Sequence, residues 1–172
     1  TEAIINLLEA RINVLEKSLM NSLSTSIYSD GTGSSGKEVG GLQLLVADAG
    51  TGTVGGINSS TFTFWQNAQT TATSSAFSVA NVQSDMNTMY LSLVRGSDSP
   101  NLIMAGTNAY TAFLGSLQAI QRITSDDMAR SGFTSLQYLN SDVVFDSACN
   151  TNRMYFLNTD YLRLEVAASR DF

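Results

Sequence analysis

The segment with the clearest potential for chemistry reads GTGSSGK, from Gly31 to Lys37. Its glycines and lysine match the positions with which a P-loop holds the phosphates of a nucleotide. Glu38, however, stands where Ser or Thr should bind magnesium, and it would repel a phosphate. A helix is predicted before the loop where a strand is required, and Val39 with two glycines makes a poor start for the helix that should follow. We therefore interpret this segment as a turn-rich loop and predict no cofactor.

Four acidic residues could form a carboxylate site for a metal ion or for acid–base catalysis. They are Asp126, Asp127, Asp142 and Asp146. Asp126 and Asp127 are adjacent, so their side chains diverge on a helix and cannot face one substrate. They follow a Thr-Ser pair and suit the first turn of a helix, where acids interact well with the helix dipole. We interpret them as helix-capping residues.

Cysteine and histidine usage excludes several kinds of site. The chain has one cysteine and no histidine, so an internal disulfide, a Cys/His metal site and a histidine-based catalytic triad cannot form. Cys149 lies in an Asn/Ser/Thr-rich loop without an evident cluster of cations, which indicates a structural thiol. We predict no catalytic residue and no metal ligand, and we expect that the protein is not an enzyme.

Composition and charge limit the partners. Of the 172 residues, 43% are hydrophobic and 14% are charged, against about 25% charged in an average chain. A surface poor in charge suits packing against neighbouring copies, because like-charge repulsion is small. The net charge is −6 and the basic residues are scattered, so specific nucleic-acid binding is not expected. No apolar run approaches the about 18 residues of a membrane span, so no membrane partner is predicted.

Apolar periodicity predicts a long helix at the start of the chain. One stripe of residues recurs at spacings of three and four, which is typical of an amphipathic helix from Glu2 to about Tyr28. The stripe contains Ile4, Leu8, Ile12, Leu15, Leu19 and Leu23. The loop that begins at Ser29 and ends at Gly36 follows it.

The remaining elements alternate irregularly. We predict two further helices, near residues 79–95 and 107–123, the second with Tyr110, Phe113, Leu114, Leu117 and Ile120 on a common face. A turn is predicted at Asn140, Ser141 and Asp142, between two strands. Strands are expected at residues 42–47, 61–65, 102–104, 133–139, 143–145, 153–157 and 161–166. This order indicates an α+β fold, with a long helix followed by a mixed central sheet that helices flank.

Several blocks, in a consistent order, resemble one family. They are YSDGTG after the long helix, GLQLLV, TVGGI with the aromatic segment that ends at Trp65, NLIMAGTNAYTAFLGSLQ, QRI, GFTSLQYLNSDVVFD and NRMYFLNTDYLRLEV. This series is similar to the second half of tailed-bacteriophage major capsid proteins with the Hong Kong 97-type shell fold. The resemblance implies that residues 1–28 are the spine helix of the peripheral (P) domain and that residues 29–172 are mainly the axial (A) domain.

The resemblance also implies a function and a setting. The protein would be a structural subunit that forms pentamers and hexamers with itself and assembles, in the cytoplasm of a bacterial host, into the icosahedral capsid of a virion. Scaffold, portal or decoration proteins would be further partners, and double-stranded DNA would be packaged without sequence-specific binding. The family's N-terminal arm, extended loop and C-terminal return to the P-domain have no counterpart here, so we expect a fragment and assign no crosslinking residue.

Two glycine-rich loops and the Ser/Thr-rich segment at residues 66–75 are the predicted self-association surfaces. The residues singled out in the loops are Asp30, Gly31, Gly33, Gly36, Thr51, Gly52, Thr53, Gly55 and Gly56. Two alternatives stay open. One is a shell protein of a cargo-holding nanocompartment or gene-transfer particle with the same fold, and the other is a nucleotide-binding enzyme that uses Gly31 to Lys37.

Overall fold

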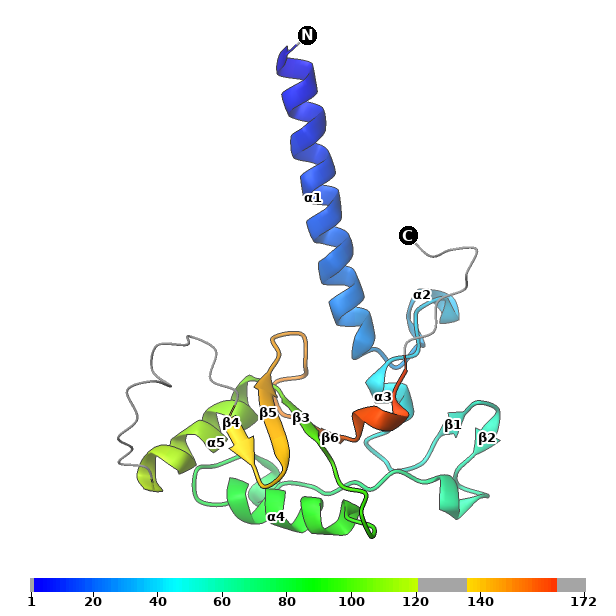
Figure 1. The fold of residues 1–172 in the computed structure, drawn as a ribbon. Coiled ribbons are helices and arrows are strands. Elements are labelled where there is room, and N and C mark those ends of the chain that lie inside the picture. Colours follow the sequence, from blue (N-terminus) through cyan, green and yellow to red (C-terminus); the bar gives the residue numbers. More distant parts are fainter. Residues whose placement is uncertain (1, 121–135, 164–172) are drawn as a thin grey trace. The chain divides into compact units, whose positions relative to one another are not determined.

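The chain forms two compact units, Thr1–Gln69 and Thr70–Phe172. The computed structural model describes residues 2–120 and 136–163 (Figure 1). The first unit combines the first helix with the residues that follow it, because the chain folds back against the end of that helix. There the N–H of Gly41 donates to the carbonyl oxygen of Ser29 at 2.9 Å, and Tyr28 and Leu42 are both buried.

Helix α1 (Glu2–Ile27) confirms the long helix predicted from the apolar stripe. The hydroxyls of Thr25 and Ser26 donate back to the carbonyl oxygens of Asn21 and Ser22, at 3.0 and 2.8 Å. Such side chains offer the backbone an alternative partner, which suits them to the last turns of a helix. The N–H of Tyr28 then bonds to the carbonyl of Thr25 at 3.1 Å, a tighter i to i−3 bond that closes the helix.

A turn region follows α1, as predicted. An antiparallel bridge joins Asp30 to Gly40, and helix α2 (Gly33–Gly36) is a single turn inside that loop. Ser34, Ser35 and Gly36 have φ values of 49°, 60° and 78°, so three successive residues lie in the left-handed region. Residues other than glycine rarely adopt this backbone conformation, and an α-helix does not contain it. We therefore describe α2 as an irregular turn.

The predicted strand at residues 42–47 is wrong. Leu42–Leu45 forms helix α3, in which the N–H groups of Leu44 and Leu45 bond to the carbonyl of Gly41 at 3.1 and 3.2 Å. Only Leu42 is buried, and Leu45 is 43% exposed. A short apolar run fits a strand or a helical turn equally well. In the described part of this unit no strand lies beside the run, and the turn satisfies its backbone groups locally.

A small hairpin and a 3₁₀ turn complete the first unit. Strands β1 (Thr53–Val54) and β2 (Ile57–Asn58) pair antiparallel across Gly55 and Gly56. The predicted strand at residues 61–65 is wrong, because Thr63–Trp65 is a 3₁₀ turn. Its β-branched and aromatic residues favour strands only where a neighbouring strand offers a packing surface.

The second unit contains a four-stranded mixed sheet with the order β4-β5-β3-β6 (Figure 1). Its strands are β3 (Leu102–Ala105), β4 (Leu136–Tyr138), β5 (Ser141–Phe145) and β6 (Met154–Leu157). β3 pairs parallel with β5 and antiparallel with β6, and β4 pairs antiparallel with β5. The predicted central strand at residues 102–104 is therefore confirmed.

Two helices pack with this sheet around one core. They are α4 (Val82–Leu93) and α5 (Thr107–Ile120). The core combines residues of both helices and of β3 and β5, namely Val82, Met86, Ile103, Ala112, Phe113 and Val143. Within residues 107–117 of α5 the buried side chains are Ala109, Ala112, Phe113 and Ser116, whereas Leu114, which was placed on the common face, is 37% exposed. The fold is α+β, with a mixed sheet and associated helices.

Two boundaries in this unit differ from the predictions. The turn between β4 and β5 consists of Leu139 and Asn140, with Leu139 at φ 52°, so Ser141 and Asp142 belong to β5. Thr159–Tyr161 is a 3₁₀ turn and not the start of the strand expected at residues 161–166. Leu162 and Arg163 are not in a strand either. Residues 164–166 of that predicted strand, residues 121–123 of the second predicted helix and residues 133–135 of the predicted strand lie outside the described residues.

Candidate interaction surfaces

The first predicted surface is the loop that contains Asp30, Gly31, Gly33 and Gly36. One oxygen of the Asp30 carboxylate accepts the N–H and the hydroxyl of Thr32, at 2.9 and 2.8 Å. These two bonds lower the pKa of Asp30, because they favour the charged form. Gly31 has a φ of 76°, and a Cβ there would lie 3.2 Å from the Cα of Gly40. The glycine is thus needed for the close approach that closes the loop.

The same loop lacks the arrangement of a phosphate-binding P-loop. Helix α1 precedes it, and after Lys37 the chain forms the bridge at Gly40 before the four-residue α3. The carboxylate of Glu38 accepts the hydroxyl of Ser29 at 2.9 Å, so an acidic group lies beside the loop. A phosphate would meet a negative charge there and no regular helix N-terminus.

The second predicted surface, which contains Thr51, Gly52, Thr53, Gly55 and Gly56, is the hairpin loop. All five residues are exposed, and the two turn glycines have φ values of 59° and 79° with open space around them. L-amino acids with side chains rarely adopt such angles, so glycine fits this turn. The loop presents backbone to the solvent.

Ser59 organises the hairpin loop, although it was not among the predicted residues. Only 4% of Ser59 is exposed, and its hydroxyl forms hydrogen bonds with both backbone groups of Gly52. Nothing in the local pattern marks this serine, because its partner lies seven residues earlier. Its one local motif, the glycosylation-like Asn58-Ser59-Ser60, indicates nothing about burial.

The Ser/Thr-rich segment at residues 66–75 is held at separate points. Asn67 donates through Nδ2 to the carbonyl of Ala47 at 3.0 Å, within the first unit. In the second unit, Thr73 donates its N–H and its hydroxyl to the Asp85 carboxylate, at 3.0 and 2.6 Å. These anchors restrict the segment even though its composition is typical of a loop.

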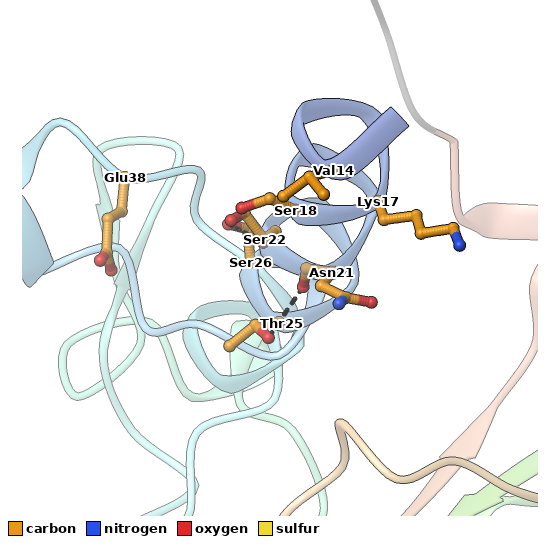
Figure 2. Close-up of a pocket in the computed structure, with 8 residues that line it drawn as sticks. All are labelled: Val14, Lys17, Ser18, Asn21, Ser22, Thr25, Ser26 and Glu38. Carbon is orange, nitrogen blue, oxygen red and sulfur yellow. Dashed lines mark hydrogen bonds between the residues drawn. The ribbon is translucent and has the colours of Figure 1, made fainter. Parts of the chain in front are cut away.

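A shallow groove runs along one face of α1 and has a volume of about 610 Å³ (Figure 2). Small polar side chains dominate it; the lining residues are Val14, Lys17, Ser18, Asn21, Ser22, Thr25, Ser26 and Glu38. The hydroxyls of Thr25 and Ser26 already bond to the helix backbone. The groove offers polar contacts but no pair of groups arranged as a nucleophile and a base.

Among the described residues of the first unit, the stripe on α1 is an exposed apolar surface. Its residues Leu8, Ile12, Leu15, Leu19 and Leu23 are 50–69% exposed. A second exposed group, in the same unit, is the aromatic segment of Phe62, Phe64 and Trp65, in which the two phenylalanine rings lie edge to face at 6.0 Å. Exposed apolar surface of this kind is typical of interaction sites.

Two of the four carboxylates considered for a metal site, Asp142 and Asp146, lie among the described residues and belong to no metal-binding cluster there. Asp142 is exposed on β5, and Asp146 accepts the N–H of Ala148 at 2.9 Å in the turn after that strand. Asp126 and Asp127 lie outside the described residues. Across residues 2–120 and 136–163, no three Asp, Glu or Cys side chains lie close enough together to hold a metal ion.

Cys149 is buried, with 3% of its surface exposed. Burial and the nearby Asp146 carboxylate raise the pKa of its thiol to about 11, although Arg153 acts in the opposite direction. A thiol with a raised pKa is a poor nucleophile at neutral pH. These features favour the structural interpretation of Cys149.

None of the helices in the described ranges is both long enough and apolar enough to cross a membrane. In comparisons with protein families, curated proteins and solved structures, nothing matches the chain.

Proposed function

We propose that this protein is a structural shell subunit, similar to the major capsid protein of tailed bacteriophages, and that it acts by binding copies of itself around double-stranded DNA. The observation that carries the proposal is the apolar stripe of α1, whose large side chains are at least half exposed. In this proposal, α1 serves as the spine helix and the sheet of the second unit belongs to the axial domain.

Free-energy considerations support a partner for the stripe. Removing apolar surface from water contributes about 25 cal/mol per Å². Leu8, Leu15 and Leu19 each expose 59% or more of their surface. Burying these side chains against another protein surface would therefore stabilise the association substantially. A subunit of a large assembly gains this stabilisation from its neighbours, at many weak contacts.

The glycine-rich loops support the same function. Hydrogen bonds from Thr32 to Asp30, and between Ser59 and Gly52, fix both loops within the first unit. A loop that is ordered before binding loses less conformational entropy on association. Such loops suit repeated contacts between identical subunits.

The test is to express the complete gene product in bacteria, alone and with its scaffold protein, and to examine it by electron microscopy and sedimentation. We expect rings or closed shells that protect double-stranded DNA from nuclease. Particles that protect protein cargo would favour the nanocompartment alternative. Monomers under both conditions, together with ATP or GTP binding that Lys37→Ala abolishes, would favour the enzyme alternative.

A further inference from the structure

The apolar stripe of α1 follows a heptad pattern over part of its length. Leu8, Ile12, Leu15 and Leu19 are separated by four, three and four residues, so they occupy alternating d and a positions of heptads lettered a to g. Each is at least half exposed. Such spacing forms the seam along which two helices of a coiled coil meet.

We propose that this seam pairs with the same seam of a second copy, in a parallel two-stranded coiled coil. The residue types favour this arrangement. Ile12 is β-branched and lies at one a position, Leu19 lies at the other, and Leu8 and Leu15 lie at d positions. Leucine at d and a β-branched residue at a are the preference of parallel dimers, which Leu8, Leu15 and Ile12 follow.

Charges beside the seam complement each other only in the parallel orientation. Arg11 occupies a g position, and Glu9 and Glu16 occupy e positions. In a parallel pair, a g residue faces the e residue five positions later in the other helix, so Arg11 of each copy faces Glu16 of its partner. In an antiparallel pair, e positions face each other and Glu16 would meet Glu9, which is unfavourable.

The seam ends inside α1. The next d and a positions are Ser22 and Ser26, which line the polar groove. Pairing is therefore confined to the part of α1 before Ser22. Only a small number of apolar a and d layers is then available to offset the entropy lost on association. We expect a reversible dimer with a dissociation constant of about micromolar order.

This inference rests on the proposed function for its biological setting, since it names one contact through which copies would associate. It is tested separately, because dimerisation is measured on the 172-residue chain in solution and shell formation on the complete gene product. Shell formation by the complete gene product without dimerisation of the 172-residue chain would support the proposed function and contradict the α1 pair. Dimerisation through α1 without shell formation would support the pair and contradict the proposed function.

The first experiment is sedimentation equilibrium of the chain over a range of concentrations, with two matched variants. Leu15→Asp places a charge in the seam and should weaken the dimer at least about tenfold, because a charge would be buried without a partner. Val14→Asp changes the adjacent residue, which is similarly exposed (67% against 69%) but lies outside the seam, and should leave the dimer intact. A monomer at all concentrations, or equal effects of the two variants, would overturn the proposal.

The second experiment reverses the charges. Arg11→Glu and Glu16→Arg should each weaken the dimer about two- to tenfold, the range expected for two exposed ion pairs. The double variant R11E/E16R should restore wild-type dimerisation, because the parallel pairs re-form with opposite sign. Failure of the double variant to restore the dimer would exclude the parallel register. Far-UV circular dichroism of each variant checks that α1 stays helical.

Discussion

The hydroxyl of Ser59 accepts the N–H of Gly52 at 2.9 Å and donates to the carbonyl oxygen of the same residue at 3.0 Å. The backbone N–H of Ser59 also donates to that carbonyl, at 2.9 Å. One buried serine thus joins the two sides of the hairpin loop outside its strand pairs. The geometry of the second predicted self-association surface depends on this contact.

Ser59→Ala should destabilise the first unit by about 0.5–1.5 kcal/mol, because both backbone groups of Gly52, an exposed residue, lose their hydrogen bonds to the Ser59 hydroxyl. The free energy of unfolding can be followed through the fluorescence of Trp65, the single tryptophan of the chain, which lies in this unit. Hydrogen exchange at residues 51–58 should also become faster. Ser60→Ala, at an exposed position, is the control. Equal stability of the two variants would contradict the role of Ser59.

Gly41→Ala should destabilise the same unit by about 1–3 kcal/mol, as overpacking of a close contact does. A Cβ at this position would lie 2.2 Å from the carbonyl oxygen of Ile27 and 2.5 Å from that of Ser26. Those atoms belong to the backbone at the end of α1, so they cannot move aside cheaply. Gly52→Ala is the control, since its Cβ would meet only the Ala47 side chain, at 3.9 Å. Unchanged denaturant unfolding of Gly41→Ala would show that α1 and the following segment do not meet in this way.

Phe113→Ala should destabilise the second unit by about 3–5 kcal/mol, because it leaves a cavity in the core. Phe113 is fully buried and its ring lies edge to face with that of Tyr138, at 5.9 Å. Leu114→Ala, at the neighbouring position with 37% exposure, should cost much less. Urea unfolding followed by near-ultraviolet circular dichroism compares the two. A larger effect at Leu114 would place the other face of α5 against the sheet.

The thiol of Cys149 should lower the stability of the fold at high pH. Its pKa is raised from about 9.0 to about 11, so below pH 9 the thiol is protonated in both states and its contribution is fully present. Between pH 9 and about 11 the unfolded chain loses this proton first, and the free energy of unfolding falls. The free energy of unfolding should fall less over this pH range in Cys149→Ala than in the wild type. The variant lacks the titration of the thiol and keeps those of the tyrosines and lysines. Rapid labelling of the native thiol near neutral pH would contradict the burial of Cys149.

The parts of the fold that the sequence predicted correctly are long or strongly patterned. The stripe of α1 repeats over several turns, and the apolar residues of β3 lie between a proline and a helix start. The prediction for residues 42–45 failed because a short segment with three leucines fits a strand or a helical turn, and the choice depends on whether a strand lies beside it. The turn at Leu139 was misplaced because a leucine with φ 52° has no signature in sequence.

The candidate surfaces were predictable in position but not in their construction. Glycines marked both loops, since a turn needs their conformational freedom. The contacts that hold the hairpin loop and the Ser/Thr-rich segment connect Ser59 to Gly52 and Asn67 to Ala47, across 7 and 20 residues. Such pairs depend on the path of the folded chain, and no local spacing reveals them.

The position of β3 in its sheet has a consequence for synthesis of the protein. Its residues 102–105 pair with residues 142–145 on one side and with residues 154–157 on the other. On the ribosome, β3 emerges well before either neighbouring strand. The backbone donors and acceptors on both of its edges therefore have no strand partner during this interval, and such unpaired edges favour aggregation of the nascent chain. The second unit therefore gains its core late in translation, whereas α1 and the β1–β2 hairpin need only residues already made.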